Sequence, residues 1–246
     1  MPFPELSAAQ RERLFYIEYL LLFTGQLRRK DLVNRFSISE PAATKDLSIF
    51  SVLAPEIIEY DRRQKHYKYR KGSLKFEHDV DQSLFALAGE RALTQSFDNE
   101  LLIPSAVNSS IKRQLPIEIV SAITRCISQR LSAKCNYLSL TSGEKERVLS
   151  PVATVHDGLR WHVRCFDHEA KKFKDYNLAR FVSVVESTGT EVSLESDNNW
   201  NKIVEIKLVA HPKLSNPETI EWDYHMMDGV RRIETRACLV LSLIHI

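Results

Sequence analysis

Glycine and cysteine are scarce in this sequence, and each shortage excludes a class of protein. The 246 residues include only seven glycines, and these do not form the glycine-rich loop that cradles phosphates in nucleotide-binding enzymes. The four cysteines lie far apart, without a CxxC pair or a Cys/His spacing suited to zinc. We therefore expect no zinc site and no disulfide framework, and we expect the protein to work in the reducing cytoplasm.

Long hydrophobic runs and catalytic constellations are also missing. No run approaches the ~20 apolar residues of a membrane-spanning helix, and the first residues lack the pattern of a signal peptide. The sequence offers no recognisable pair of catalytic carboxylates, nucleophile beside a base, or set of metal ligands. Since 43% of the residues are hydrophobic and 27% are charged, the composition is that of a globular protein. We expect two or three domains, no membrane association, no cofactor and no enzymatic activity.

The first seventy residues predict three helices followed by a basic hairpin. Apolar spacing and turn residues place these helices and strands at residues 6–24, 28–36, 40–50, 57–60 and 66–70. Ser7 and Ser39 are suitable N-caps for the first and third helices, and Gly25 ends the first. This order is that of a winged helix-turn-helix domain, whose third helix enters the major groove of DNA while the wing follows the phosphate backbone.

The third predicted helix has an apolar face and a polar face. Ala43, Leu47 and Phe50 recur at helical spacing and are expected to be buried. The segment around Thr44 and Lys45 resembles the helix-turn-helix of many bacterial repressors, in which these positions face DNA. The residues expected to contact DNA are Arg28, Arg29, Lys30, Ser39, Pro41, Thr44, Lys45, Ser48, Arg62, Arg63 and Lys65. The alternative is that these helices mediate protein contacts and that their charges form a solvated surface.

The middle of the chain predicts two more amphipathic helices. They fall at residues 79–97 and 116–130, and residues 98–108 between them are interpreted as a loop because Pro104 and two asparagines break the periodicity. Cys126 lies on the apolar face of the second helix, where a lone cysteine is usually part of the core. We expect this region to be a helical spacer between the DNA-binding domain and a sensor or dimerisation module.

Several short strands with regularly spaced turns follow, and they indicate a small, strongly bent sheet or partial barrel. One of these strands spans residues 158–166. Alternation divides its side chains between two faces, with Arg160, His162 and Arg164 on one and Trp161, Val163 and Cys165 on the other. The basic row is either the half-exposed face of a strand or the floor of a pocket for an anion. Trp161 points away from it and is expected in the core.

Three motifs of this β-rich region occur together. They are Leu149-Ser150-Pro151, Gly158-Leu159-Arg160-Trp161-His162-Val163-Arg164 and Phe173-Lys174-Asp175-Tyr176-Asn177-Leu178-Ala179-Arg180-Phe181. They resemble the WYL domain, in which a Trp-Tyr-Leu tripeptide lies on a strand of an Sm-like β-barrel, and here His162 replaces the tyrosine. Together with the winged helix, nearly the whole chain resembles the winged-helix–WYL repressors that control phage-defence operons of the BREX and CBASS kinds.

The resemblance implies that a pocket of the WYL domain accepts a nucleotide or a nucleic-acid fragment. The matching positions are Tyr137, Ser139, Ser150, His156, Arg160, His162, Arg164 and Arg180. Arginine can bind phosphate in a bidentate manner, and aromatic and imidazole rings can stack on a base. Two of these positions have a structural alternative, because Arg180 could hold a carboxylate such as Asp175, and His156 could cap the turn before Gly158.

The C-terminal region predicts a strand at residues 200–213, a helix at 216–230 and a second strand at 231–241. In the family that the chain resembles, a domain after the barrel supports homodimerisation. The last six residues, 241–246, resemble an in-frame translation of a transposon-end sequencing adapter. We therefore expect the chain to be truncated within this domain and its last six residues to be non-native.

The whole sequence predicts an α+β protein of four parts. These are a winged helix-turn-helix domain (1–75), a helical linker (76–130), a WYL sensor domain (131–190) and an incomplete C-terminal α/β dimerisation domain (200–246). We expect a homodimeric repressor that binds an inverted-repeat operator in double-stranded DNA and is released by a nucleotide or oligonucleotide effector. The alternative is an accessory protein that binds single-stranded nucleic acid and modulates a partner nuclease or helicase. The basic wing favours the repressor.

Overall fold

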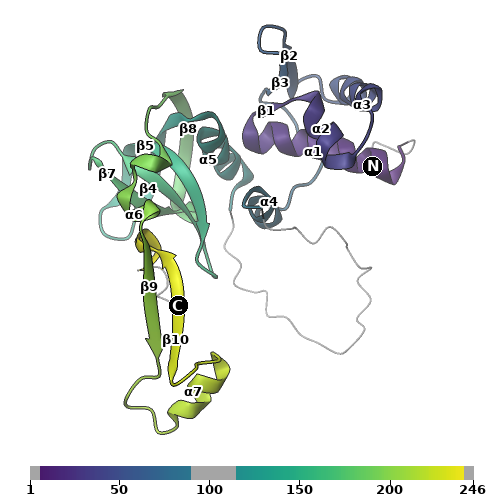
Figure 1. The fold of residues 1–246 in the computed structure, drawn as a ribbon. Helices are drawn as coiled ribbons and strands as arrows, with labels where there is room; N and C mark the ends of the chain where they lie inside the picture. The colour runs from purple at the N-terminus through teal and green to yellow at the C-terminus, as the bar shows by residue number, and fades with distance from the viewer. Residues whose placement is uncertain (1–5, 90–114, 241–246) are drawn as a thin grey trace.

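The computed structural model describes residues 6–89 and 115–240, and it confirms the predicted α+β fold. Figure 1 shows a helical head at the N-terminus, a sheet with a helix beside it in the middle, and a two-stranded hairpin that extends away from this sheet. The predicted helix beyond Gly89, the predicted loop at 98–108 and the last six residues lie outside the described residues. Among the described helices, none combines the length and the apolar character needed to cross a membrane.

The N-terminal head is a winged helix. Its elements are α1 (Ala8–Thr24), β1 (Gln26–Leu27), α2 (Arg29–Phe36), α3 (Glu40–Leu53), β2 (Ile58–Asp61) and β3 (His66–Tyr69). The predicted helix ends are confirmed: the hydroxyls of Ser7 and Ser39 each accept a hydrogen bond from a backbone N–H of the first turn, and Gly25 ends α1 with a φ of 77°. β1 was not predicted; it pairs with β3, so the sheet order is β1–β3–β2.

One apolar core holds the helices of the head together. Ala43, Leu47 and Phe50 of α3 are at most 1% exposed, as predicted, and they share this core with the fully buried Leu14 and Ile17 of α1. Burying a side chain of this kind stabilises a fold by about 1.5–3 kcal/mol. Because these residues fix which side of α3 faces inward, its opposite side is left to solvent.

After the wing, the chain returns to α1 and contacts it through a buried carboxylate. Glu18 is fully buried and accepts hydrogen bonds from the N–H groups of Lys75 at 2.8 Å and Phe76 at 2.9 Å. Its Oε1 also lies 3.0 Å from Nε2 of His78. The chain then forms α4 (Val80–Leu87), the described part of the helix predicted from residue 79.

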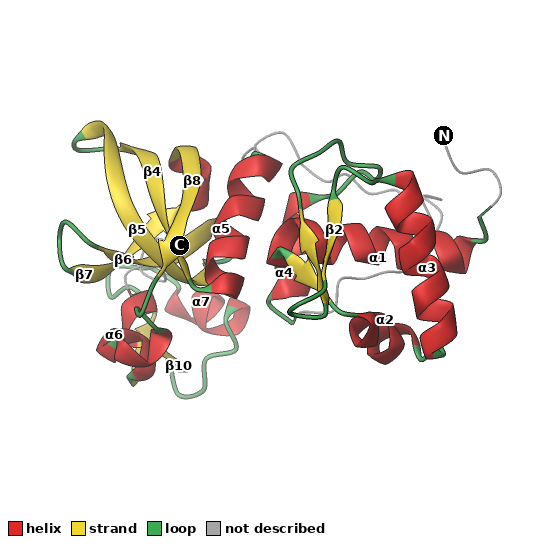
Figure 2. Ribbon diagram, turned by 90° about the horizontal axis from the view of Figure 1, so that it is seen from above, coloured by secondary structure: helices red, strands yellow, loops and turns green. Residues whose placement is uncertain are grey.

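The middle domain is a five-stranded antiparallel sheet with one long helix packed on it. Its elements are α5 (Ile117–Gln129), β4 (Leu131–Ser139), β5 (Gly143–His156), β6 (Trp161–Asp167), β7 (Lys172–Asn177), a 3₁₀ turn (Leu178–Arg180) and β8 (Phe181–Gly189). Their order is β7–β6–β5–β4–β8. A bulge between Pro151 and Ala153 interrupts the pairing of β5 with β6, and Figure 2 shows the resulting bent sheet, as predicted. Trp161, Val163 and Cys165 are at most 5% exposed, which confirms the core face of β6.

α5 lies between the head and the sheet in both Figure 1 and Figure 2. Val120, Ile123 and Cys126 are fully buried in the same core as the strands. α1 of the head also contacts α5. The helix therefore belongs to the core of the sheet domain and at the same time forms its junction with the head.

The C-terminal region is a hairpin with a short helix at its far end. β9 (Ile203–Val209) pairs with β10 (Val230–Arg236), and α7 (Pro217–Asp223) lies between them in the chain. Among the described strands, these two pair only with each other. At the base of the hairpin the guanidinium of Arg236 donates to the Trp200 carbonyl at 2.7 Å and lies 4.5 Å from the centre of the Trp200 ring.

Three predicted extents in this region were wrong. The last strand was predicted to run to residue 241, but β10 ends at Arg236 and a 3₁₀ turn (Ala237–Leu239) follows. The strand does not begin at residue 200, because Asp197 accepts hydrogen bonds from two backbone N–H groups and caps a short helix, α6 (Asn198–Asn201). The helix predicted to run to residue 230 ends at Asp223, because the chain then reverses through His225 and Asp228 in the left-handed region.

Candidate functional site

The polar face of α3 is open to solvent. Pro41, Thr44, Lys45 and Ser48 are all exposed, whereas Ser39 uses its hydroxyl to accept the Ala42 N–H. Lys45 offers an ammonium donor that suits a base edge or a phosphate. The hydroxyls of Thr44 and Ser48 donate to the carbonyls of Glu40 and Thr44, both at 2.9 Å, and would rotate to contact DNA. The four exposed side chains therefore form a face that can enter a groove, with Ser39 fixing the start of the helix that carries it.

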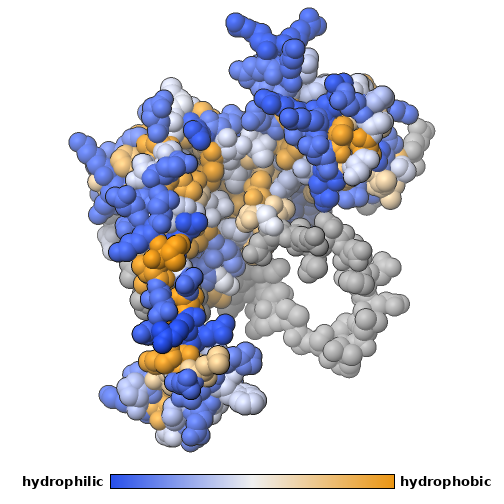
Figure 3. Space-filling model, viewed as in Figure 1, coloured by the Kyte–Doolittle hydropathy of each residue, from blue (hydrophilic) through white to orange (hydrophobic). Residues whose placement is uncertain are grey.

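The start of α2 and the tip of the wing come together beside α3. They line one hollow of about 420 Å³, formed by Arg28, Arg29, Lys30, Glu40, Gln64 and Lys65. Arg29 joins α2 to α3, because its guanidinium lies 3.0 Å from the Glu40 carboxylate and 3.3 Å from the Thr44 hydroxyl. Four basic residues gathered here are a suitable contact for a DNA backbone. In Figure 3 the surface over the wing is strongly hydrophilic.

Asp61 holds the wing tip in shape. Its Oδ1 accepts hydrogen bonds from the N–H groups of Arg63 at 2.8 Å and Gln64 at 3.0 Å, and its Oδ2 pairs with Lys68. These contacts, the one with Lys68 foremost, lower the pKa of Asp61 to about 2. Arg62 and Arg63 are exposed on the turn that Asp61 stabilises.

A second site lies at one end of the middle sheet. Residues of β4, β5, β7 and the neighbouring turns line a pocket of about 400 Å³. Tyr137, Ser139 and Arg180, three of the predicted ligand residues, line it together. Within the described part of the chain, Arg180 makes no ion pair, and Asp175 pairs with Arg164 instead.

Arg147 and Lys174 also line this pocket, and neither was predicted from the sequence as a ligand residue. Each lies two residues before a core residue, Leu149 on β5 and Tyr176 on β7, so each belongs to the inward face of its strand. Basic residues are rarely found at inward-facing positions, and this was the signal that would have found them. With Arg180 they bring three basic side chains to one pocket.

Asp167, fully buried at the end of β6, pairs with one of these basic residues, Lys174. Its Oδ2 accepts hydrogen bonds from Lys174 Nζ and from the Tyr176 hydroxyl, both at 2.7 Å. Burial acts to raise the pKa of Asp167, but these hydrogen bonds outweigh it and hold the pKa well below the usual range. Arg147 lies farther away, with Nη1 at 3.5 Å, and its Nε is buried without a described partner. Nη1 of Arg147 also lies 3.8 Å from the largely exposed Glu169 carboxylate. Arg180, which makes no ion pair among the described residues, is therefore the main donor left for an anion, and the weakly paired Arg147 can add to it.

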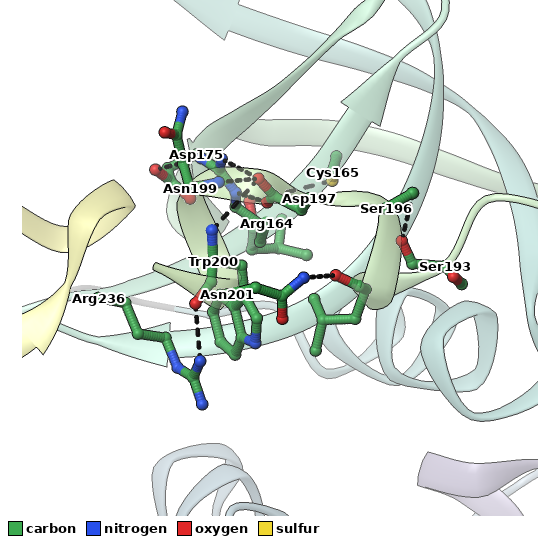
Figure 4. Close-up of polar contacts among 12 residues, drawn as sticks. Arg164, Cys165, Asp175, Ser193, Ser196, Asp197, Asn199, Trp200, Asn201 and Arg236 are labelled. Atoms are coloured by element: carbon green, nitrogen blue, oxygen red, sulfur yellow. Dashed lines mark hydrogen bonds and ion pairs between the residues drawn. The ribbon is translucent and has the colours of Figure 1, made fainter. Parts of the chain in front are cut away.

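On the other face of β6, Arg164 is enclosed in an ion-pair cluster (Figure 4). Its guanidinium donates to both oxygens of Asp197, at 2.7 and 3.2 Å, and to Asp175 at 2.9 Å. Arg164 and Asp197 are 4% and 2% exposed. Burial raises the pKa of Asp175. The basic row of this strand was expected to face a ligand, but the segment after β8 covers its last arginine, which strand alternation alone does not reveal.

His162 and His156 are held by the turn between β5 and β6. Nε2 of His162 lies 2.9 Å from the carboxylate of Asp157. Nδ1 of His156 accepts the N–H of Gly158 at 3.3 Å, which confirms the turn-capping alternative for this histidine. The His156 ring also packs against Trp161, with 4.9 Å between the ring centres.

The two remaining predicted residues lie outside the lining of this pocket. The fully buried Ser150 has its hydroxyl 2.8 Å from Nε2 of His168 and 3.1 Å from the hydroxyl of Thr190. Nε of Arg160 is buried without a described partner. The structure thus brings three of the eight predicted ligand residues together, and binding of a ligand by any of the eight stays a prediction.

Three family models match the chain in the order of its domains. The winged helix-turn-helix domain of the BrxR transcriptional regulator matches residues 9–79, and the WYL domain matches residues 118–186. The C-terminal dimerization domain of the BrxR transcriptional regulator matches residues 203–245. The WYL match begins inside α5, the helix that packs on the sheet.

Curated relatives match along almost the whole chain. The DNA-binding transcriptional repressor CapW of Escherichia coli (strain KTE188) is 31% identical over 255 residues, covering 96% of this chain and 81% of the relative. CapW of Pseudomonas aeruginosa is 33% identical over 244 residues, with the same coverage. CapW of Stenotrophomonas maltophilia is 29% identical over 252 residues, covering 96% of this chain and 83% of the relative.

Two solved structures are more distantly similar. Proteasome accessory factor B/C (PafBC) of Arthrobacter aurescens has 14% identity and a TM-score of 0.28, covering 96% of this chain and 45% of that chain. A CRISPR Cas-related protein has 14% identity and a TM-score of 0.32, covering 74% and 53%. The chain spans about half the length of these two proteins.

Proposed function

The chain belongs to the CapW family of DNA-binding transcriptional repressors, and on this premise we propose that it is a homodimeric, sequence-specific repressor of a phage-defence operon. The observation that carries the proposal is the exposed polar face of α3 beside a cluster of basic residues from α2 and the wing. Thr44 and Lys45 are exposed on this face, and Arg28, Lys30 and Lys65 line the neighbouring hollow. In this arrangement α3 reads base edges in the major groove, and the basic cluster contacts phosphates.

Operator binding tests this proposal directly. DNA bound by the purified chain would be selected from a genomic pool, and its affinity measured by fluorescence anisotropy. Replacing both Thr44 and Lys45 with alanine is expected to weaken operator binding roughly tenfold or more, because base and phosphate contacts are lost together. Lys172→Ala is the matched control, since it removes an exposed charge from β7 of the middle domain, outside the winged helix. Unchanged operator affinity in the Thr44/Lys45 double variant would refute the assignment of α3.

The C-terminal hairpin supports a homodimer. A two-stranded sheet is at best marginally stable alone in water, because it leaves apolar side chains and backbone groups unpaired. Here Ile203 and Val209 are 55% and 60% exposed, and Trp222 and Met227 are each 82% exposed. Figure 3 shows hydrophobic patches along this hairpin. A second copy of the chain would cover them, and two winged helices would then bind an inverted repeat. Light scattering coupled to size exclusion tests the dimer.

The effector site that we propose is the pocket bounded by Tyr137, Arg147, Lys174 and Arg180. Arginine donors suit a phosphate group, whereas Tyr137, which is only 7% exposed and packs edge-on against Tyr176, forms a wall of the pocket and offers little ring surface to a base. A nucleotide or oligonucleotide bound there would release the operator only if it prefers the DNA-free state of the protein. Titration of the protein–operator complex with mononucleotides and short oligonucleotides tests this step.

A repressor role and a single-stranded accessory role give different binding preferences. A repressor binds one duplex sequence far more tightly than others, whereas an accessory protein for a nuclease or helicase prefers single strands of any sequence. The exposed face of α3, with the basic wing beside it, favours binding to duplex DNA. The same architecture supports a cytoplasmic DNA-binding protein with no catalytic role.

A further inference from the structure

The C-terminal end of α1 is capped by side chains of another domain. Because α1 ends at Thr24, the carbonyl groups of its last turn lack partners within the helix. Arg125 of α5 donates from Nη1 to the Leu22 carbonyl at 2.7 Å, and Gln129 of α5 donates from Nε2 to the Thr24 carbonyl at 3.0 Å. A guanidinium at this end of a helix is also favoured by the helix dipole. The head is therefore joined to α5 by directional hydrogen bonds.

Arg125 contacts two further elements from the same position. Its guanidinium carbon lies 4.7 Å from the centre of the Tyr69 ring on β3, the strand of the wing. Its Nε donates to Oε1 of Glu186 on β8 at 2.8 Å, and Nη2 donates to the same oxygen. The Arg125 side chain is only 11% exposed. One side chain thus connects the recognition head, the wing strand and a strand of the sheet domain.

β8 connects this junction to the proposed effector pocket. The 3₁₀ turn that ends with Arg180 leads directly into β8 at Phe181. In the pairing of β4 with β8, Tyr137 lies opposite Phe181, and Ala133 lies opposite Glu186. The pocket and the Arg125 junction therefore occupy two positions on one pair of strands, roughly 16 Å apart at ~3.3 Å per residue.

We propose that Arg125 is a positioning residue that sets the orientation of the winged helix on the sheet domain and passes displacements of β8 to it. The inference rests on the proposed function, because operator binding is one of its readouts. Two recognition helices must match half-sites about 34 Å apart or a multiple of this distance. If the head takes many orientations, the competent fraction falls and the apparent affinity falls with it. An effector that shifts β8 acts on the head through Glu186 and Arg125.

The test measures the orientation itself in the full chain. Spin labels at Val52 on α3 and Leu159 in the β5–β6 turn, 81% and 66% exposed, report the distance between head and sheet domain after Cys238 is replaced by serine. The parent protein is expected to show one narrow distance distribution. Arg125→Ala is expected to broaden this distribution and to weaken operator binding about tenfold, a change equivalent to ~1.4 kcal/mol. An unchanged distribution in this variant would overturn the proposal.

Three further variants separate positioning from charge and from folding. Arg130→Ala removes the same charge from the C-terminal end of α5 without removing a contact of the Arg125 junction, and it is expected to leave the distance distribution unchanged. Arg125→Lys keeps the charge but replaces three guanidinium nitrogens, which donate to the Leu22 carbonyl and to Glu186, with a single one. It is expected to broaden the distance distribution, and a narrow distribution in this variant would contradict the proposal. If Arg125→Ala does not fold, Glu186→Ala removes the ion pair of the junction from the β8 side and is expected to broaden the distance distribution.

The two proposals can fail separately. A parent protein that binds no operator refutes the proposed function, while the distance measurement still decides the role of Arg125.

Discussion

The two faces of β6 carry clusters built from the same kinds of side chain, but the charges are balanced differently. On one face a single guanidinium, Arg164, is bound by Asp175 and Asp197. On the other, Asp167 is bound by Lys174 and lies farther from Arg147. The first cluster has two acids and one base. The second has three bases, Arg180 included, against two acids, because the largely exposed Glu169 also lies 3.8 Å from Arg147. The availability of an arginine to a ligand therefore depends on the carboxylates near it, and not on the strand face alone.

Removing the arginine of the enclosed cluster is expected to have the largest effect. Arg164→Ala leaves two buried or half-buried carboxylates without a counter-charge, which costs about 3–5 kcal/mol of unfolding free energy. Urea unfolding followed by circular dichroism measures it. Arg180→Ala, which removes an arginine from the pocket, is the control and is expected to change stability by no more than about 0.5 kcal/mol. If both variants lost a similar amount of unfolding free energy, the two clusters would not differ in how strongly their arginines are held.

Neutralising Asp167 is expected to have the next largest effect. Asp167→Asn weakens the charge-assisted hydrogen bonds from Lys174 and Tyr176, at a cost of about 1.5–3 kcal/mol near pH 7. Since the folded pKa is lowered, the unfolded state binds the proton more tightly, and the contribution is present above the unfolded pKa of about 3.9 and lost as pH falls toward the folded value. The variant should thus lose stability less steeply below pH 4 than the parent. If the free energy of unfolding fell equally steeply below pH 4 in the variant and the parent, the role assigned to Asp167 would be contradicted.

Asp175 is expected to behave in the opposite way, with a smaller effect. Its folded pKa is raised by burial, so the folded state binds the proton more tightly and stability falls as pH rises through that pKa. Its Oδ1 is also buried without a described partner. Asp175→Asn is therefore expected to be neutral or stabilising by up to about 1 kcal/mol at pH 7, because Asp197 still pairs with Arg164. Urea unfolding at pH 5 and pH 7 measures this, and a loss above 2 kcal/mol would show that Asp175 is an essential partner of Arg164.

The smallest effect on stability is expected in the pocket, where binding should change instead. Arg147→Ala and Arg180→Ala each remove donors for a phosphate, and each is expected to weaken binding of a nucleotide effector roughly tenfold. Isothermal titration with the effector found in the operator-release titration measures the change. Lys174→Ala is expected to weaken binding less, because Asp167 already neutralises this ammonium. If Lys174→Ala lost more affinity for the effector than Arg180→Ala, the arginines would not be the main phosphate donors of the pocket.

The head could be predicted from the sequence in detail, because its signals are local. Ser7 and Ser39 cap helices through N–H groups three residues away, and Gly25 ends α1 with its own backbone. The environment of Arg164 could not be predicted in this way. Asp197 reaches it from 33 residues away, and strand alternation describes a face without describing what covers that face.

The residues of the pocket could be predicted only in part from the sequence. Tyr137, Ser139 and Arg180 were found through the family resemblance, while Arg147 and Lys174 were missed although their inward phase is visible in the sequence. The extents of β9 and α7 were also misjudged. A helix cap at Asp197 and a reversal through left-handed residues shortened them, and periodicity alone does not report either feature.

The capping of α1 by α5 has a consequence for the order in which the protein folds. The partners of the Leu22 and Thr24 carbonyls lie 103 and 105 residues later in the chain. Contacts of such separation form late, because a long loop must close before they contribute. We therefore expect the last turn of α1 to fray in a folding intermediate whose winged helix is otherwise formed, and its amide protection to appear only when α5 has docked.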